Sequence, residues 1–242
     1  MYWQDEGVVL ASRRHGESAS VVTLMTRAHG RHAGLVRGGH GKRARSLYQP
    51  GNRLEVAWRA RLPDQLGQLS AEPLALLAAR LLHDPDRLAA LGAACAVLDV
   101  GLPERDPHPR LYDALTHFLE LLVEDEQWPE SYVRFEVDLL AELGFGLDLS
   151  ACAVTGATED LAFVSPASGR AVSRQGAGTY APRLLPLPAF LIEGGPADDA
   201  ALLEGLRLTG AFLRHHLFDA TDRAVPPARE RLVSRISQRL QP

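Results

Sequence analysis

Alternating apolar and polar positions dominate the first 70 or so residues. The clearest case is the segment LEVAWR at residues 54–59, in which every second side chain is large and apolar. A period of two indicates a β-strand with one buried face and one solvated face. Glycine and proline separate further segments of this kind. We expect five short strands, at residues 6–11, 18–26, 31–36, 52–60 and 66–71. Five strands in so short a stretch favour a small closed barrel of the OB type, because closure removes exposed strand edges.

After Glu72–Pro73 the pattern changes to that of helices rich in alanine and leucine. Asp86 is expected to cap one of them and the pair Asp198–Asp199 another, while Pro226–Pro227 suits the first turn of the last helix. Cys95 lies among alanines and is interpreted as a packed core thiol. The predicted helices span residues 74–82, 86–98, 111–123, 130–143 and 198–217, with a last one beginning at 226–227.

A segment rich in glycine, serine, threonine and proline interrupts the helices at residues 148–197. Short β-like pieces at 161–164 and 170–173 indicate a small, turn-rich insertion. The expected fold class is therefore α+β, an OB-fold barrel followed by a helical bundle that carries the insertion. We predict a barrel domain at 1–72, a helical domain made of 73–147 and 198–242, and the insertion at 148–197.

The chain's one lysine, Lys42, lies in a glycine-rich loop between the third and fourth predicted strands. This loop, RGGHGKRAR at residues 37–45, contains no acidic residue. Its potential cations repel one another unless something negative joins them, and its glycines let the backbone approach a ligand closely. Two interpretations are open: a flexible, solvated hairpin loop, or a phosphate-binding loop on the barrel. The distribution of charge along the chain favours the second.

Charge is distributed unevenly although the 242-residue chain has a formal net charge of only −4. Residues 1–61 contain 11 lysines and arginines against 4 acidic residues, a balance of about +7. Subtraction from the totals of 26 and 30 leaves about −11 for the remainder. The split predicts a polyanion-binding front domain and a back half with a different task.

Other features of the composition are those of an ordinary globular protein, with 46% hydrophobic and 23% charged residues. No apolar run approaches the roughly 18 residues of a membrane span. The N-terminal MYWQDEG is acidic where a signal peptide would be basic. Cys95 and Cys152 alone give no disulfide framework. We expect a cytoplasmic protein.

An OB-type protein that binds single strands needs a cationic groove and flat side chains on which bases stack. Tyr48 follows the basic loop and is a stacking candidate, whereas Trp58 is in register with apolar residues and is interpreted as core. Arg53 and Arg59 are interpreted as covering the outer face. A barrel poor in aromatics and rich in arginine should bind the nucleic-acid backbone regardless of base sequence. The predicted DNA-binding residues are Arg13, Arg14, Arg31, Arg37, His40, Lys42, Arg43, Arg45 and Tyr48.

Two segments resemble the RecO family of bacterial recombination mediators. The first runs from GVVLASRR at residue 7 to LEVAWRAR, which ends at residue 61, and is followed by LGQLSAE. The second is RFEVDLLAELGFGLDLSACAVTG at residues 134–156. The resemblance covers nearly the whole chain in order. It implies an OB-fold that binds single-stranded and double-stranded DNA, annealing of complementary strands, and partnership with RecR and single-strand-binding protein (SSB) in loading RecA.

The insertion departs from the metal-binding version of the family, in which two Cys-x-x-Cys pairs hold a structural zinc. Here the first pair reads Cys152-Ala-Val-Thr155, and the second is expected near Ser165-Pro-Ala-Ser168. Tetrahedral zinc needs four thiolate or imidazole-type ligands, and no histidine lies between residues 118 and 214. We expect a zinc-ribbon-like insertion without metal and a protein without any cofactor. Thr155, Ser165 and Ser168 are expected to hydrogen-bond to turns instead.

Arg134 is the one lysine or arginine within residues 111–169. One interpretation is an ion pair with Glu130 or Asp138, four residues away on the same helix. The other starts from the family resemblance, which suggests the SSB tail as a partner. A short acidic peptide that ends in an aromatic residue needs a cation beside an apolar slot. Arg134 is therefore a candidate receptor for this tail.

Sequence motifs of catalysis are missing: the chain has no nucleophile elbow, P-loop or HExxH motif. His215 and His216 are adjacent, so on a helix they point about 100° apart and do not converge on a metal; a place at a helix C-terminus accounts for them better. We expect a non-catalytic DNA-binding mediator of recombinational repair. Two alternatives stay open: a metal-dependent enzyme that processes nucleic acids with scattered carboxylates, and an RNA-binding OB module.

Overall fold

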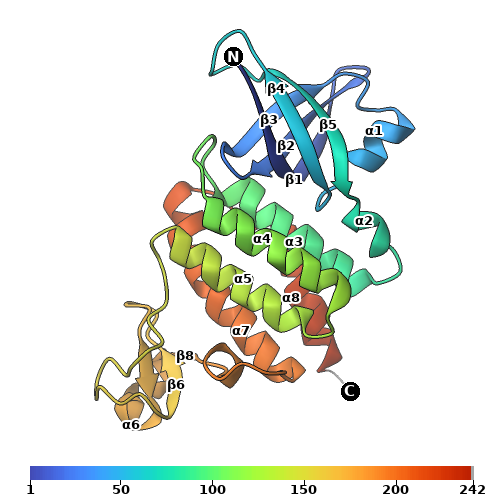
Figure 1. Ribbon diagram of the computed structural model, residues 1–242. Helices are drawn as coiled ribbons and strands as arrows, with labels where there is room; N and C mark the ends of the chain where they lie inside the picture. Colours follow the sequence, from blue (N-terminus) through green and yellow to red (C-terminus); the bar gives the residue numbers. More distant parts are fainter. Residues whose placement is uncertain (241–242) are drawn as a thin grey trace. The chain divides into compact units, whose positions relative to one another are not determined.

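The computed structural model describes residues 1–240. It contains an N-terminal barrel, helices and a second, small sheet (Figure 1), so the predicted α+β class is confirmed. The chain divides into two compact units. Unit 1 comprises Met1–Glu124 with Pro226–Arg229, and unit 2 comprises Asp125–Val225 with the residues from Glu230 onward. The three-part division expected from the sequence stays a prediction.

A closed five-stranded barrel with strand order β1-β2-β3-β5-β4 forms the first part of unit 1. Its strands are β1 (Tyr2–His15), β2 (Ala19–Thr26), β3 (Gly30–Val36), β4 (Arg53–Arg59) and β5 (Gln68–Ala75). β1 is longer than the predicted 6–11, because its first half pairs with β4 and its second half with β2. β5 also exceeds its predicted range and includes Pro73, which lies opposite Leu54. The barrel closes at a single parallel pair, Leu35 with Gln68.

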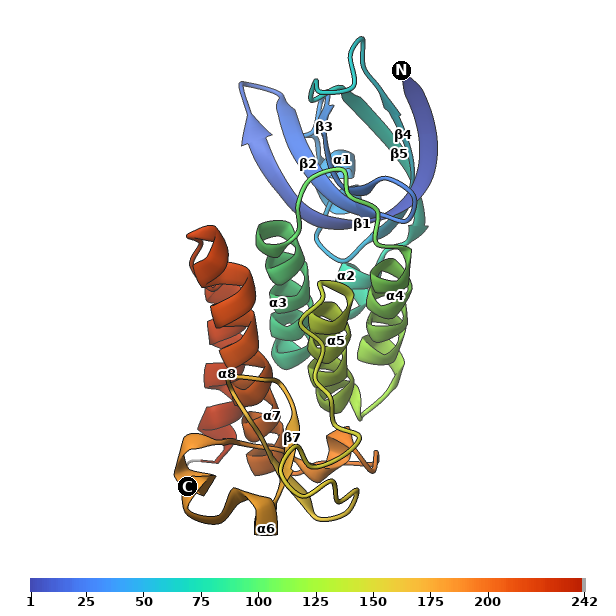
Figure 2. The same ribbon diagram turned by 90° about the vertical axis from the view of Figure 1, so that its left-hand side faces the viewer.

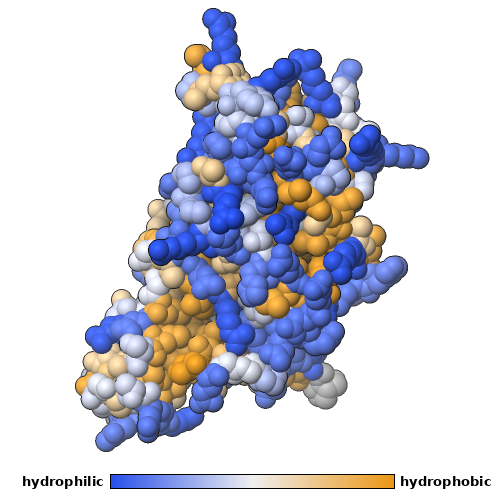
Figure 3. Space-filling model, in the orientation of Figure 1, coloured by the Kyte–Doolittle hydropathy of each residue, from blue (hydrophilic) through white to orange (hydrophobic). Residues whose placement is uncertain are grey.

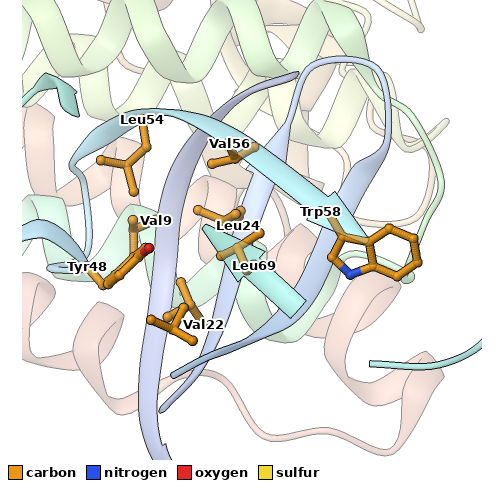
Figure 4. Packing of buried hydrophobic residues seen from close by; sticks show 9 residues of the cluster. Val9, Val22, Leu24, Tyr48, Leu54, Val56, Trp58 and Leu69 are labelled. Atoms are coloured by element: carbon orange, nitrogen blue, oxygen red, sulfur yellow. The ribbon is translucent and has the colours of Figure 1, made fainter. Parts of the chain in front are cut away.

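Alternate side chains of the strands fill the barrel interior (Figure 4). Trp58 is 1% exposed, so its interpretation as a core residue is confirmed. Burial of each large apolar side chain stabilises the fold by about 1.5–3 kcal/mol. The labelled residues of this core are Val9, Val22, Leu24, Tyr48, Leu54, Val56, Trp58 and Leu69.

Four helices complete the main part of unit 1: α1 (Lys42–Leu47), α2 (Leu77–Arg80), α3 (Pro85–Gly101) and α4 (Pro109–Glu124). The predicted helix at 74–82 is wrong in extent, because β5 continues to Ala75 and only four residues form α2. The predicted cap is also shifted. Asp84, followed by Pro85 at the first position, accepts hydrogen bonds from the amides of Asp86 and Arg87 at 3.0 Å each. α3 packs against β1 (Figure 2), and its Cys95 is a buried core thiol, as predicted.

Unit 2 contains α5 (Trp128–Glu142), α7 (Asp199–Phe212), a π-helical segment η3 (Leu213–Phe218) and the short η4 (Asp219–Thr221). The capping role of Asp198 is confirmed, since its side chain accepts from the amide of Ala201 at 2.8 Å. α5 and α7 meet at Glu136, a buried carboxylate that accepts hydrogen bonds from Tyr132 at 2.8 Å and from Thr209 at 2.5 Å. Residues of the last helix, α8 (Pro227–Arg239), belong to both units.

The predicted insertion forms a small sheet with strand order β7-β6-β8. It consists of β6 (Leu161–Val164), β7 (Ala171–Ser173), α6 (Arg174–Ala177), η1 (Gly178–Arg183), β8 (Leu185–Pro186) and η2 (Ala189–Leu191). Both β-like pieces expected from the sequence are therefore strands. None of the helices within residues 1–240 has the length and apolar character needed to cross a membrane.

Candidate nucleic-acid interface

Two of the predicted DNA-binding arginines are engaged inside unit 1. Arg13 pairs with Asp99 of α3 through Nη2 and Oδ2 at 2.5 Å. Arg31, whose side chain is 12% exposed, lies 3.8 Å from the other oxygen of Asp99 and donates from Nε to the carbonyl oxygen of Leu102 at 2.9 Å. It also lies 3.4 Å from Glu104. These contacts hold barrel strands against α3, so we leave Arg13 and Arg31 out of the proposed DNA-binding set.

Arg27 and Arg53 are paired in the same way with α4. Arg27 lies 3.0 Å from Asp113, and Arg53 lies 3.0 Å from Glu120. These ion pairs neutralise part of the positive charge, so the barrel has fewer unpaired cations than the count from the sequence suggests.

Four cations remain exposed after Val36, at the end of β3: Arg37, Lys42, Arg43 and Arg45. No ion pair involves any of them within residues 1–240. The last three belong to α1, so the predicted loop at 37–45 is wrong in its second half, which is helical. Figure 3 shows hydrophilic side chains at α1, with an apolar patch next to them. Four like charges within nine residues repel one another unless an anion lies among them.

Local contacts fix the turn that leads into α1. Gly38 has a φ of +67°, a conformation that favours glycine. A Cβ at Gly39 would lie 2.6 Å from the side chain of Ser20, so only glycine lets the turn pack on β2. The amide of Gly41 donates to the carbonyl oxygen of Gly38 at 3.0 Å, and that of His40 to Ser18 at 3.3 Å. The basic segment is thus a structured turn and helix.

Two further predicted residues lie near this turn. Arg14 is exposed, and its backbone pairs with Ser20, the residue on which Gly39 packs. His40 is half-buried, and its Nε2 is buried without a hydrogen-bond partner among the described residues. The structure therefore brings together Arg14, Arg37, His40, Lys42, Arg43 and Arg45 at one edge of the barrel.

Tyr48 is not exposed as a stacking platform would be. It is 6% exposed and belongs to the barrel core, where desolvation raises the pKa of its phenol. The exposed aromatic residue of the barrel is Tyr2, at 63%. Tyr2 is absent from the predicted set because the first strand was expected to begin at residue 6. Exposed and half-buried positions alternate from Tyr2 to Glu6 in the folded strand, but the sequence YWQDE does not alternate apolar and polar residues, so the pattern did not indicate the longer strand.

Arg134 is half-buried on α5 and makes no ion pair within the described residues, so the interpretation as an ion pair with Glu130 or Asp138 is wrong. Its Nη2 donates to the carbonyl oxygen of Phe190 at 3.0 Å, and its guanidinium carbon lies 5.7 Å from the centroid of the Phe190 ring. Glu130 instead accepts a hydrogen bond from the amide of Ala197 at 2.6 Å.

The thiol of Cys152 has polar neighbours where a zinc site would have thiolates. Its Sγ accepts hydrogen bonds from the amide of Thr155 at 3.4 Å and from the amide and hydroxyl of Ser173 at 3.2 and 3.3 Å. A Cβ at Gly176 would lie 2.8 Å from this sulfur. Desolvation of the buried thiol opposes ionisation, but the hydrogen bonds from Ser173 and Thr155 outweigh it and lower the pKa of Cys152 to about 6.

The positions facing Cys152 are therefore Thr155, Ser173 and Gly176. The predicted second pair, Ser165 and Ser168, is wrong. These residues form the turn between β6 and β7, in which the amide of Ser168 donates to the carbonyl oxygen of Ser165 at 3.3 Å. The expected turn contact of Thr155 is present, since its hydroxyl accepts from the amide of Ala157 at 3.3 Å.

Among residues 1–240, no group of three or more His, Cys, Asp or Glu side chains could hold a metal ion. His215 and His216 lie in the π-helical segment η3. There the His216 ring stacks on Phe145 at a centroid distance of 4.6 Å. Packing thus accounts for His216.

Comparison with known proteins shows similarity along nearly the whole chain. The family described as Recombination protein O N terminal matches residues 1–76, and that described as Recombination protein O C terminal matches residues 82–223. The DNA repair protein RecO of Rhodospirillum rubrum is 50% identical over 241 residues, which cover 97% of this chain and 96% of the relative. The DNA repair protein RecO of Ruegeria sp. is 47% identical over 241 residues, 99% of this chain and 100% of the relative. That of Paracoccus denitrificans is 50% identical over 238 residues, 98% and 97% of the two chains.

Proposed function

The chain belongs to the RecO family of DNA repair proteins, and on this premise we propose that it is a DNA-binding recombination mediator. The observation that carries the proposal is the set of exposed, unpaired cations on the turn and α1: Arg37, Lys42, Arg43 and Arg45. Arg14 and His40 extend this set along the barrel edge. We call these six residues the basic edge.

The basic edge suits a ligand with closely spaced phosphates. Each cation that contacts a phosphate releases condensed counterions, which makes binding favourable and dependent on salt. Arginine and lysine contacts to phosphates read no base identity. We therefore propose that the basic edge binds single-stranded and double-stranded DNA of any sequence.

Strand annealing follows from the same physical property. Two complementary single strands repel each other through their phosphates, and this repulsion slows their encounter. A protein that neutralises phosphates of both strands lowers the barrier. We propose that the protein anneals complementary strands in this way, without catalytic chemistry.

Protein partners complete the proposal. The acidic tail of SSB would bind in unit 2 beside Arg134, a cation next to the aromatic ring of Phe190. A cationic hydrogen-bond donor beside an apolar side chain is what such a tail requires. We also propose that the protein works with RecR on SSB-coated DNA to help load RecA, as its family membership suggests.

Annealing of labelled complementary strands, measured with and without SSB, tests this function. We expect the protein to accelerate annealing of bare strands and to act also on SSB-coated strands. The same strands incubated with the protein and Mg²⁺ should stay full length. Cleavage of the strands, or a failure to anneal at any salt concentration, would contradict the proposal. Competition with RNA of equal length distinguishes an RNA-binding module.

A further inference from the structure

The barrel surface has a hollow that shares one lining residue, Arg37, with the basic edge. It has a volume of about 560 Å³ and lies over β4, β5 and the end of β3. A second hollow of about 670 Å³ adjoins it, since both are lined by Tyr2, Arg59 and Gln68. We name the two hollows together the Tyr2 groove. All of its lining residues belong to unit 1.

The Tyr2 groove is lined by positive side chains and by no acidic one. Arg37 lines the first hollow, Arg61 the second and Arg59 both. Within the described part of the chain, none of these arginines takes part in an ion pair. Arg59 donates from Nε and Nη2 to the side-chain oxygen of Gln68 at 3.2 and 2.8 Å. This neutral partner orients the guanidinium and leaves its charge available to an anion.

Tyr2 supplies a flat surface in the middle of the groove. Its side chain is 63% exposed, although the neighbouring Trp3 packs on the ring of Trp58 at a centroid distance of 5.5 Å. The strand pairing of β1 with β4 places Tyr2 directly opposite Arg59. Side chains of directly opposed residues are within contact distance of each other. An exposed ring next to an oriented guanidinium is suited to a ligand that is both planar and anionic.

We propose that the Tyr2 groove is a binding subsite for single-stranded nucleic acid, in which an unpaired base stacks on Tyr2 and the adjoining phosphates contact Arg37, Arg59 and Arg61. The subsite rests on the proposed DNA-binding function and adds strand selectivity to it. A duplex keeps its bases stacked inside and offers Tyr2 no free base. The basic edge thus binds phosphates of either form, whereas the Tyr2 groove favours the single-stranded form.

Substitution of Tyr2 by alanine tests the subsite, with Tyr2→Phe as the variant that keeps the flat ring. Stacking of one base on an aromatic side chain contributes about 1–3 kcal/mol, so Tyr2→Ala should weaken binding of a single-stranded oligonucleotide of about 15 nucleotides roughly 5- to 150-fold. Tyr2→Phe should stay within about twofold of wild type, because its ring has the same stacking face. Tyr180→Ala, which removes a tyrosine that is 65% exposed in unit 2, serves as a matched control.

Two further ligands separate stacking from charge. Duplex DNA, and a single strand of the same length that lacks its bases, should bind wild type and Tyr2→Ala with equal affinity. The inference is wrong if Tyr2→Ala binds the normal single strand as wild type does. It is also wrong if the variant loses affinity for all three ligands alike, or if an acidic peptide without nucleotides displaces the strand from the groove.

The outcomes for the subsite and for the proposed function are distinguishable. If Tyr2→Ala has no effect while a double substitution at Lys42 and Arg43 weakens binding, the subsite fails and the proposed function stands. If wild-type protein binds neither single-stranded nor duplex DNA, the proposed function itself fails. Circular dichroism of each variant establishes that the barrel is folded.

Discussion

The ring of His32 packs edge-on against those of Trp3 and Trp58, at centroid distances of 4.9 and 4.8 Å. Its side chain is buried, and neither ring nitrogen has a hydrogen-bond partner among the described residues. Desolvation, with a smaller contribution from the charge of Arg105, lowers the pKa of His32 to about 4. The barrel interior therefore holds a neutral histidine.

Acid should destabilise the barrel through this residue. The unfolded chain takes up a proton at His32 below a pH of about 6.5, while the folded protein resists it down to about 4. The unfolded state thus binds more protons in this window, so stability decreases as the pH is lowered from about 6.5 to about 4. A pKa difference of this size corresponds to about 3 kcal/mol at most. Above pH 6.5 His32 has no such effect.

Urea unfolding of wild type and His32→Phe between pH 7 and pH 4 measures this contribution. The variant keeps an aromatic ring beside Trp3 and Trp58 but cannot be protonated. We expect its free energy of unfolding to decline less steeply with falling pH than that of wild type. Two curves that decline in parallel would show that His32 does not take part.

Individual residues also mark the limit of prediction from sequence. The alternation in β4 identified Trp58 as core, and the acid-free segment after β3 identified four exposed cations. The engagement of Arg13 and Arg31 was not predictable, because Asp99 and Glu104 are about 70–90 residues away along the chain. Pairing across such distances depends on tertiary packing, which a local pattern does not contain.

At the scale of elements, strongly periodic segments were predicted well and weakly periodic ones were not. The helices α5 and α7 and the strands β6 and β7 lie close to their expected ranges. α1 was missed because glycines precede it and its arginines form no apolar face. The segment LALLAARLL has the composition of a helix, yet pairing with β4 draws its first residues into β5. Strand pairing thus overrides helix propensity there.

The insertion is expected to bind no zinc. Purified protein should contain no stoichiometric zinc, and a chelator should leave its melting temperature unchanged, because Cys152 is the one cysteine among the four positions that face each other. Elemental analysis close to one zinc per chain would contradict this account.

A variant with Thr155→Cys, Ser173→Cys and Gly176→Cys serves as the positive control. It places four thiols around the position of Cys152, so it should bind about one zinc per chain and melt at a lower temperature after chelation. Failure of the triple variant to bind zinc would mean that these four positions do not converge as the hydrogen bonds to Cys152 indicate.

At the scale of the whole molecule, the uneven charge distribution is the property that links sequence to function. The first 61 residues have a balance of about +7, but ion pairs with acidic residues of α3 and α4 engage several of these arginines. The cations without such partners gather at the basic edge and in the Tyr2 groove. The sequence alone predicts the sign of the charge and the domain that carries it. The structure is needed to locate the surface on which the unpaired cations lie.

The central claim is that unpaired cations of the barrel bind the phosphate backbone, and the salt dependence of DNA affinity tests it most directly. Equilibrium binding is measured over a range of salt concentrations for wild type and for Lys42→Ala with Arg43→Ala. Arg27→Ala, which removes a cation already paired with Asp113, is the matched control.

Removing one cation that binds a phosphate should lower the slope of log K against log salt by about 0.7 for single strands and 0.9 for duplex DNA. We therefore expect the double variant to bind all sequences more weakly and its slope to fall by about 1.4 to 1.8, while Arg27→Ala keeps the wild-type slope. A double variant with wild-type affinity and wild-type slope would contradict the account.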